Sequence, residues 1–320
     1  MVTIGTMFPC GVSPRELPAY AQDAERAGFG ELWVVEDCFF GGGIAAGGAA
    51  LAATERIAVG IGILPAAARN AAFTAMELGT LAELYPGRLI AGIGHGVPDW
   101  MRQVGAWPAS PLGLLEEHLT TVRQVLAGSG VSTSGPYVNV RDVRLVHPPE
   151  IAPPVLAGVR GPKSLAVAGR AADGTILAEP TPPAYVRTAL SQIAAVGAHQ
   201  LVAYSLFATD ADPAVALETV RPKVGSALAG PAADAHLAGQ PFADELRSLR
   251  GSTSSAAEFT AALPVEWLRA LAVVGTVDDC VGRLDELSEA GADSVVLVPS
   301  GDLAAHLSAA APVLAALHAL

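Results

Sequence analysis

Residues 24–35 read AERAGFGELWVV and join the end of a helix to the start of a buried strand. The same pattern returns as RAADGTIL at 170–177 and EAGADSVVLV at 289–298, and more loosely as AVGAHQLVAY at 195–204. In each copy a small residue ends a helix and an apolar run follows within a few positions. Short apolar strands that alternate with longer helices predict parallel strands joined by right-handed crossovers.

The number of such strands selects the architecture. We expect eight, each followed by a helix, at 2–8, 32–35, 57–64, 89–93, 154–158, 175–178, 200–208 and 294–298. Eight strand–helix units within 320 residues predict an α/β fold, a (β/α)₈ TIM barrel, as one domain over 1–320. A doubly wound sheet also alternates strand and helix, so the pattern alone leaves it open.

Two segments interrupt the alternation. Within 130–149, residues 137–146 have the pattern of a small hairpin strand outside the barrel. Between the seventh and eighth strands, 210–271 is too long for one crossover helix and is the longest insertion. We expect it over the barrel mouth, where it would shape substrate access, and a lid is one interpretation.

Composition excludes several classes of protein. Hydrophobic residues make up 51% of the chain, enough for a large core, and the net charge of −12 argues against a nucleic-acid partner. The three cysteines lie far apart without a CxxC or a histidine cluster, so we expect no disulfide framework, no metal and a reducing compartment. Without a signal-like N-terminus or a long apolar stretch, we expect a cytoplasmic protein with no membrane partner.

Polar residues follow two of the expected strands. Glu36 and Asp37 leave the second strand as adjacent carboxylates, so one of them should face the barrel mouth. After the fourth strand, Gly94 and Gly96 frame His95 in an open turn, and their spacing is not that of the dinucleotide fingerprint. We regard all three polar residues as candidates for catalysis, with a strand cap and a structural histidine as the alternatives.

An anion site is predicted after the fifth strand. Gly158 and Val159 end the strand, and Gly161, Pro162 and Lys163 open the next helix. Proline suits the first helical turn, and free amides at a helix N-terminus attract an anion such as phosphate. Arg160 or Lys163 could add positive charge there. A plain loop with surface basic residues is the alternative.

Further strand ends complete the predicted mouth. Gly60 and Gly62 inside the third strand indicate either a bulge, a close backbone approach to a ligand, or tight packing. Glu179 ends the sixth strand and is a further candidate for binding. The chain has no GxSxG, HExxH or GxxxxGK[ST], so hydrolase, zinc-protease and P-loop activities lack support.

With these segments in view, the chain resembles the bacterial luciferase-like superfamily of flavin- and deazaflavin-dependent oxidoreductases. It looks closest to the coenzyme F420-dependent branch, often labelled methylene-tetrahydromethanopterin reductase-like. The resemblance covers nearly the whole chain outside the insertion. The matching segments are AGFGELWVVED at 27–37, ATERIAVG at 53–60, TLAELYPGR at 80–88, GPKSL at 161–165, ADG at 172–174, GTVDDC at 275–280 and AGAD at 290–293.

The resemblance implies where a cofactor would lie. A ring of the isoalloxazine type would cross the barrel mouth, backed by a bulged third strand that often carries a non-prolyl cis peptide, here at Gly62, Ile63 and Leu64. The phosphate-bearing tail would use the anion site described above. The two carboxylates would meet the polar edge of the ring, and His95 would face the substrate as a hydrogen-bond donor or proton source.

The implied function is that of an enzyme, an oxidoreductase that transfers a hydride between coenzyme F420 and a small organic substrate. An FMN-dependent luciferase-like monooxygenase and a non-catalytic flavin- or deazaflavin-binding protein are the alternatives. The methanopterin reductases carry an acidic residue on the first strand, where this chain reads IGTMF at 4–8. We therefore do not expect their substrate. The resemblance also implies a homodimer, with the Gly/Ala-rich segment 41–54 as a contact surface.

Overall fold

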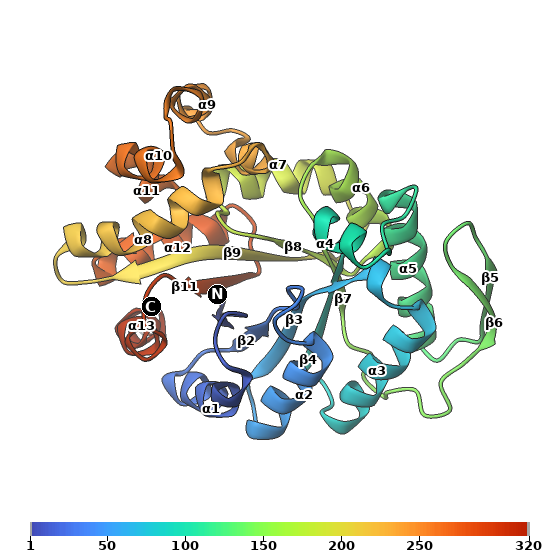
Figure 1. The fold of residues 1–320 in the computed structure, drawn as a ribbon. Coiled ribbons are helices and arrows are strands. Elements are labelled where there is room, and N and C mark those ends of the chain that lie inside the picture. The colour runs from blue at the N-terminus through green and yellow to red at the C-terminus, as the bar shows by residue number, and fades with distance from the viewer. Residues whose placement is uncertain (1, 319–320) are drawn as a thin grey trace.

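Eight parallel strands close into a barrel in the computed structural model, which describes residues 2–318 (Figure 1). The order around the barrel is β11-β1-β2-β3-β4-β7-β8-β9, and β9 pairs with both β8 and β11. This double pairing closes the sheet, so the predicted TIM barrel is confirmed and the open doubly wound sheet is wrong. The strands are β1 (Thr3–Phe8), β2 (Glu31–Val34), β3 (Ala58–Pro65), β4 (Leu89–Gly94), β7 (Val155–Gly158), β8 (Gly174–Leu177), β9 (Gln200–Thr209) and β11 (Ser294–Pro299).

Helices surround the barrel and cover its outer face (Figure 1). The pattern of residues 24–35 behaves as predicted, since the first of these helices ends at Gly28 in a left-handed conformation with a φ of 94° and β2 begins at Glu31. The helices of this ring are α1 (Leu17–Ala27), α2 (Gly43–Ala53), α3 (Ala71–Leu84), α5 (Pro111–Leu126), α6 (Pro162–Ala171), α7 (Pro183–Ile193), α8 (Pro213–Leu228), α12 (Val277–Glu289) and α13 (Leu303–His318).

The segment expected to hold a small hairpin strand contains a complete two-stranded hairpin. Strands β5 (Val131–Ser134) and β6 (Asn139–Val143) pair antiparallel and stand apart from the barrel (Figure 1). A short helix, α4 (Pro98–Gln103), lies between β4 and α5.

The long segment 210–271 divides into two parts. Its first helix, α8, packs on the barrel directly after β9. Four short helices follow, and most of them gather beside α8 at the upper left of Figure 1. They are η3 (Pro231–Leu237), α9 (Ala243–Ser252), α10 (Ala256–Ala262) and α11 (Val265–Leu271), and they lead into an unpredicted short strand, β10 (Val273–Gly275), which pairs with the end of β9. None of the helices within residues 2–318 is long and apolar enough to cross a membrane.

Candidate functional site

A cavity of about 650 Å³ opens at the carboxyl ends of the barrel strands. This volume lies within the range of pockets that hold cofactors and drug-sized ligands. Each barrel strand or the loop after it contributes to the wall, and one such residue from each, in chain order, is Met7, Asp37, Gly62, His95, Gly158, Glu179, Tyr204 and Val298. The chain therefore places its predicted strand ends around one common space.

Two aromatic side chains fill the barrel beneath this cavity. Trp33 of β2 and Tyr204 of β9 pack edge to face with ring centroids 5.6 Å apart. A Cβ atom on Gly60 would overlap the Trp33 ring, and a Cβ atom on Gly62 would overlap the Tyr204 hydroxyl. The two glycines of β3 thus make room for rings that reach across from other strands.

Strand β3 has the bulge that its glycines predicted. Its pairing with β4 shifts register between Ile61 and Leu64, and the peptide between Gly62 and Ile63 is cis, as the resemblance implied. Gly62 and Ile63 line the cavity. Leu64 does not, because its side chain is buried in the hydrophobic core behind the bulge.

Glycines of the neighbouring strands accommodate the bulge. A Cβ atom on Gly92, Gly94 or Gly158 would lie within about 3 Å of the Ile63 side chain or overlap it. Gly94 also pairs with Gly158 where β4 meets β7, so its place is in the wall behind Ile63 rather than on the cavity surface. Gly96 lines the cavity with a φ of 73°, a conformation that favours glycine.

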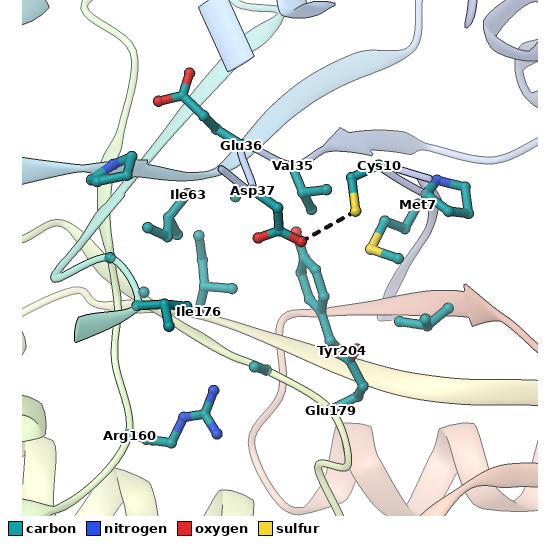
Figure 2. Close-up of a pocket in the computed structure, with 18 of the residues that line it drawn as sticks. Met7, Cys10, Val35, Glu36, Asp37, Ile63, Arg160, Ile176, Glu179 and Tyr204 are labelled. Carbon is teal, nitrogen blue, oxygen red and sulfur yellow. Dashed lines mark hydrogen bonds between the residues drawn. The ribbon is translucent and has the colours of Figure 1, made fainter. Parts of the chain in front are cut away.

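The two adjacent carboxylates have different partners, and their side chains point apart (Figure 2). Glu36 forms an ion pair with Arg69 and accepts a hydrogen bond of 2.6 Å from the backbone N–H of Gly43, so it joins the end of β2 to α2 and to the loop before α3. Asp37 points into the cavity and accepts a hydrogen bond from the Cys10 thiol at 3.2 Å. Burial, together with Asp37, raises the pKa of Cys10 to about 11, so the thiol keeps its proton.

His95 lies on the cavity wall between β4 and α6. Its Nε2 atom is 3.0 Å from the Ser164 hydroxyl oxygen. Burial lowers the pKa of His95, and the backbone of Pro111 offsets this only in part. The imidazole is therefore neutral at neutral pH and able to exchange a hydrogen bond with a ligand.

The predicted anion site is only partly on the cavity wall. Gly158 and Val159 line the cavity, but Gly161, Pro162 and Lys163 do not. Gly161 precedes the first turn of α6 with a φ of 90°, and the side chain of Lys163 is exposed to solvent. The start of α6 therefore lies beside the cavity and not inside it.

Two basic side chains lie on the cavity wall, of which the first was one of the two alternative cations of the predicted anion site and the second was not predicted. They are Arg160, which follows β7, and Lys223 of α8. Both face Glu179. Burial raises the pKa of Glu179, and the positive charges of Arg160 and Lys223 lower it again in part. Arg160 stands immediately before the predicted helix start, whereas no local pattern distinguishes Lys223 from a surface lysine.

Tyr204 is the second residue of the wall that sequence reasoning missed. Its side chain leaves β9 and points toward the β2–β3 side of the cavity (Figure 2). The hydroxyl is buried and has no hydrogen-bond partner among the described residues. The available signal was a tyrosine within the otherwise largely apolar run QLVAYSLFA at 200–208.

Comparison with known proteins gives a consistent result. A family model described as luciferase-like monooxygenase matches residues 3–294. A 5,10-methylenetetrahydromethanopterin reductase of Methanolobus tindarius is 28% identical over 317 residues, which cover 92% of this chain and 93% of that protein. An F420-dependent glucose-6-phosphate dehydrogenase of Microbacterium testaceum is 31% identical over 175 residues, 51% of this chain and 52% of that protein.

Solved structures share the fold at low identity. The coenzyme F420-dependent tetrahydromethanopterin reductase of Methanopyrus kandleri superposes with a TM-score of 0.80 at 21% identity and 97% coverage of both chains. An F420-dependent secondary alcohol dehydrogenase, in complex with an F420–acetone adduct, superposes with a TM-score of 0.77 at 19% identity and 99% coverage of both chains.

Proposed function

Because the chain belongs to the luciferase-like monooxygenase family, we propose that it is an oxidoreductase that transfers a hydride between coenzyme F420 and a small organic substrate. The observation that carries this proposal is the cavity at the barrel mouth, with the Gly62–Ile63 bulge in its wall. The names of the relatives, an F420-dependent dehydrogenase among them, support F420 as the cofactor.

The residues present fit such a cofactor. The cavity of about 650 Å³ is large enough for a cofactor ring, and Gly62, Gly96 and Gly158 are among the residues of its wall. The start of α6 with Arg160 beside it suits a phosphate group. We propose that Gly62, Ile63 and Glu179 contact the ring and that Gly158, Val159, Gly161, Pro162 and Lys163 serve the tail.

When bound, a deazaflavin supplies a ring carbon that gives or accepts a hydride. The chain's own task is to hold donor and acceptor together and to exclude water. Asp37 is the acid of the pair that faces the cavity, and Cys10 holds it in place. The neutral His95, paired with Ser164, provides a hydrogen bond at the substrate side. Glu36 acts indirectly, by anchoring the β2 loop to Arg69.

Titration of the purified protein with F420 and with FMN tests the cofactor. Binding of F420, seen by its absorbance near 420 nm, is the expected result. Tight binding of FMN with none of F420 would replace the proposal with the monooxygenase alternative. Binding of F420 without turnover of any alcohol, aldehyde or unsaturated compound in a substrate panel would favour the non-catalytic alternative.

We also propose that the protein is a cytoplasmic homodimer that pairs through α2 and α3. Helix α3 exposes Phe73, Met76 and Leu84 at 63%, 47% and 64%, and their spacing places them along one side of the helix. The neighbouring α2 is rich in glycine and alanine, which allows close helix packing. Gel filtration should show a dimer, and Phe73→Asp should yield monomer; a monomeric wild-type protein would contradict this.

We further propose that the segment 210–271 acts as a lid over the cavity.

A further inference from the structure

The Tyr204 hydroxyl stands out among the polar groups around the cavity. Only 3% of the residue is exposed, and its oxygen has no hydrogen-bond partner in the described part of the chain. Buried polar groups in folded proteins are nearly always paired, so an unpaired hydroxyl at a ligand cavity calls for an explanation. The residue lines the cavity, which makes a bound ligand the nearest source of a partner.

Several other polar side chains of the wall are already occupied. The Cys10 thiol donates to Asp37, and the carboxylate of Glu36 pairs with an arginine. His95 Nε2 is within hydrogen-bond distance of Ser164. His95 keeps one ring nitrogen, Nδ1, without a partner among the described residues, whereas the hydroxyl of Tyr204 is the single polar group of its side chain and has none at all.

The surroundings decide which hydrogen-bond role the hydroxyl can take. Burial raises the pKa of Tyr204 well above its ordinary value, and the carboxyl groups of Glu179 and Glu31 raise it further. The phenol is therefore protonated at neutral pH and has a proton to donate. Its oxygen lies 2.4 Å from the position that a Cβ atom on Gly62 would take, so the hydroxyl abuts the bulge of β3.

We propose that the Tyr204 hydroxyl donates a hydrogen bond to a carbonyl oxygen of the cofactor ring when that ring lies against the Gly62–Ile63 bulge. This inference rests on the proposed function. It assigns to a residue of β9 a contact with the ring at the bulge of β3, beside which the Tyr204 hydroxyl lies.

The test uses Tyr204→Phe, which removes the hydroxyl and keeps the ring that packs on Trp33. Fluorescence titration with F420 should give a Kd about 3- to 10-fold higher than that of the wild type, the effect of losing one neutral hydrogen bond. The ligand-free variant should melt at the same or a higher temperature, because the lost hydroxyl had no protein partner. The melting-temperature gain on adding F420 should shrink accordingly.

Tyr20→Phe is the matched control. The Tyr20 hydroxyl is also buried but is 2.8 Å from the Thr6 hydroxyl and 3.3 Å from the Met7 carbonyl oxygen. Its removal should lower the melting temperature of the ligand-free protein and leave the Kd for F420 unchanged. Tyr204→Phe is thus expected to weaken F420 binding without lowering the melting temperature, whereas Tyr20→Phe is expected to lower the melting temperature without weakening F420 binding.

Each outcome bears on the inference. A Tyr204→Phe protein that binds F420 as tightly as the wild type overturns it, as does a ligand-free melting temperature that falls as in Tyr20→Phe. Wild-type protein that binds FMN alone overturns the proposed function only, and weaker FMN binding by the variant then supports the inference, because flavins share the ring carbonyls. Wild-type protein that binds neither ring overturns both.

Discussion

Replacing Gly60 with alanine should destabilise the barrel through Trp33. The added Cβ atom would lie 2.6 Å from Cε2 of the Trp33 ring and nearer still to two other ring carbons. Carbon atoms prefer separations of about 3.5–4.0 Å, so the ring must move by roughly 1 Å. Trp33 is fully buried and is among the largest side chains of the core, so the neighbours must move with it.

Moving the ring would also strain the buried hydrogen bond of the Trp33 indole. The Trp33 indole N–H donates to Glu31 at 2.8 Å, and the Ser294 hydroxyl donates to the same carboxyl oxygen at 2.6 Å. Overpacking a core costs about 1–3 kcal/mol. Loss of a hydrogen bond to a buried group adds about 1–2 kcal/mol, so we expect the unfolding free energy to fall by about 2–5 kcal/mol.

Urea unfolding, followed by far-UV circular dichroism, measures this change. Gly282→Ala is the control, since Gly282 lies within α12 with no atom within 4 Å of the added Cβ; there we expect a gain of about 0.5–1 kcal/mol. Combining Gly60→Ala with Trp33→Phe should recover part of the loss, because the smaller ring vacates the space. A loss below about 1 kcal/mol for Gly60→Ala alone would refute the reasoning.

Three further predictions concern side chains of the cavity and the core. His95→Ala should lower kcat with an active substrate about 100-fold or weaken substrate binding while the Kd for F420 stays constant, and unchanged steady-state kinetics would remove the assigned role. Glu36→Gln should lower the unfolding free energy by about 1–3 kcal/mol, because a half-buried arginine loses its carboxylate; an unchanged urea midpoint would contradict this. Burial lowers the pKa of His118, His236 and His306 to about 4 in the folded protein, whereas these histidines take up protons near pH 6.5 in the unfolded chain. Lowering the pH from 7 to 5 should therefore reduce the unfolding free energy by roughly 2 kcal/mol for each of the three. A pH-independent unfolding free energy would count against the last prediction.

Local patterns were sufficient to predict most of the barrel. The repeats at 24–35 and 289–298 predicted helix ends and strand starts, and the glycines of 60–64 indicated the bulge of β3. These features depend on neighbours in the sequence, such as a left-handed residue after a helix or an apolar run. The first strand of the hairpin, β5, and the short strand β10 were missed, since 131–134 and 273–275 are too short to show a periodicity.

The cavity wall was less predictable. Sequence reasoning left Arg160 and Lys163 as alternative cations of the anion site, and only Arg160 lies on the cavity wall, whereas the side chain of Lys163 is exposed outside it. It missed Tyr204 because a tyrosine in a strand has the same pattern whether its hydroxyl meets solvent, a protein partner or a ligand. It could not distinguish Glu36 from Asp37, because the direction of each side chain depends on the path of the loop after β2.

The sequence alone determined the alternation of strands and helices and the edge at which the polar strand ends gather, because parallel strands direct all their carboxyl ends to one side. Only the tertiary structure decided which of those groups face the cavity. Barrel closure brings the Tyr204 ring of β9 against Gly62 of β3, more than a hundred residues away in the chain. Both Glu36 and Asp37 line the cavity, but Glu36 pairs with Arg69 whereas the side chain of Asp37 points into the cavity. Contacts of this kind depend on how distant strands are arranged around one axis, which no local pattern encodes.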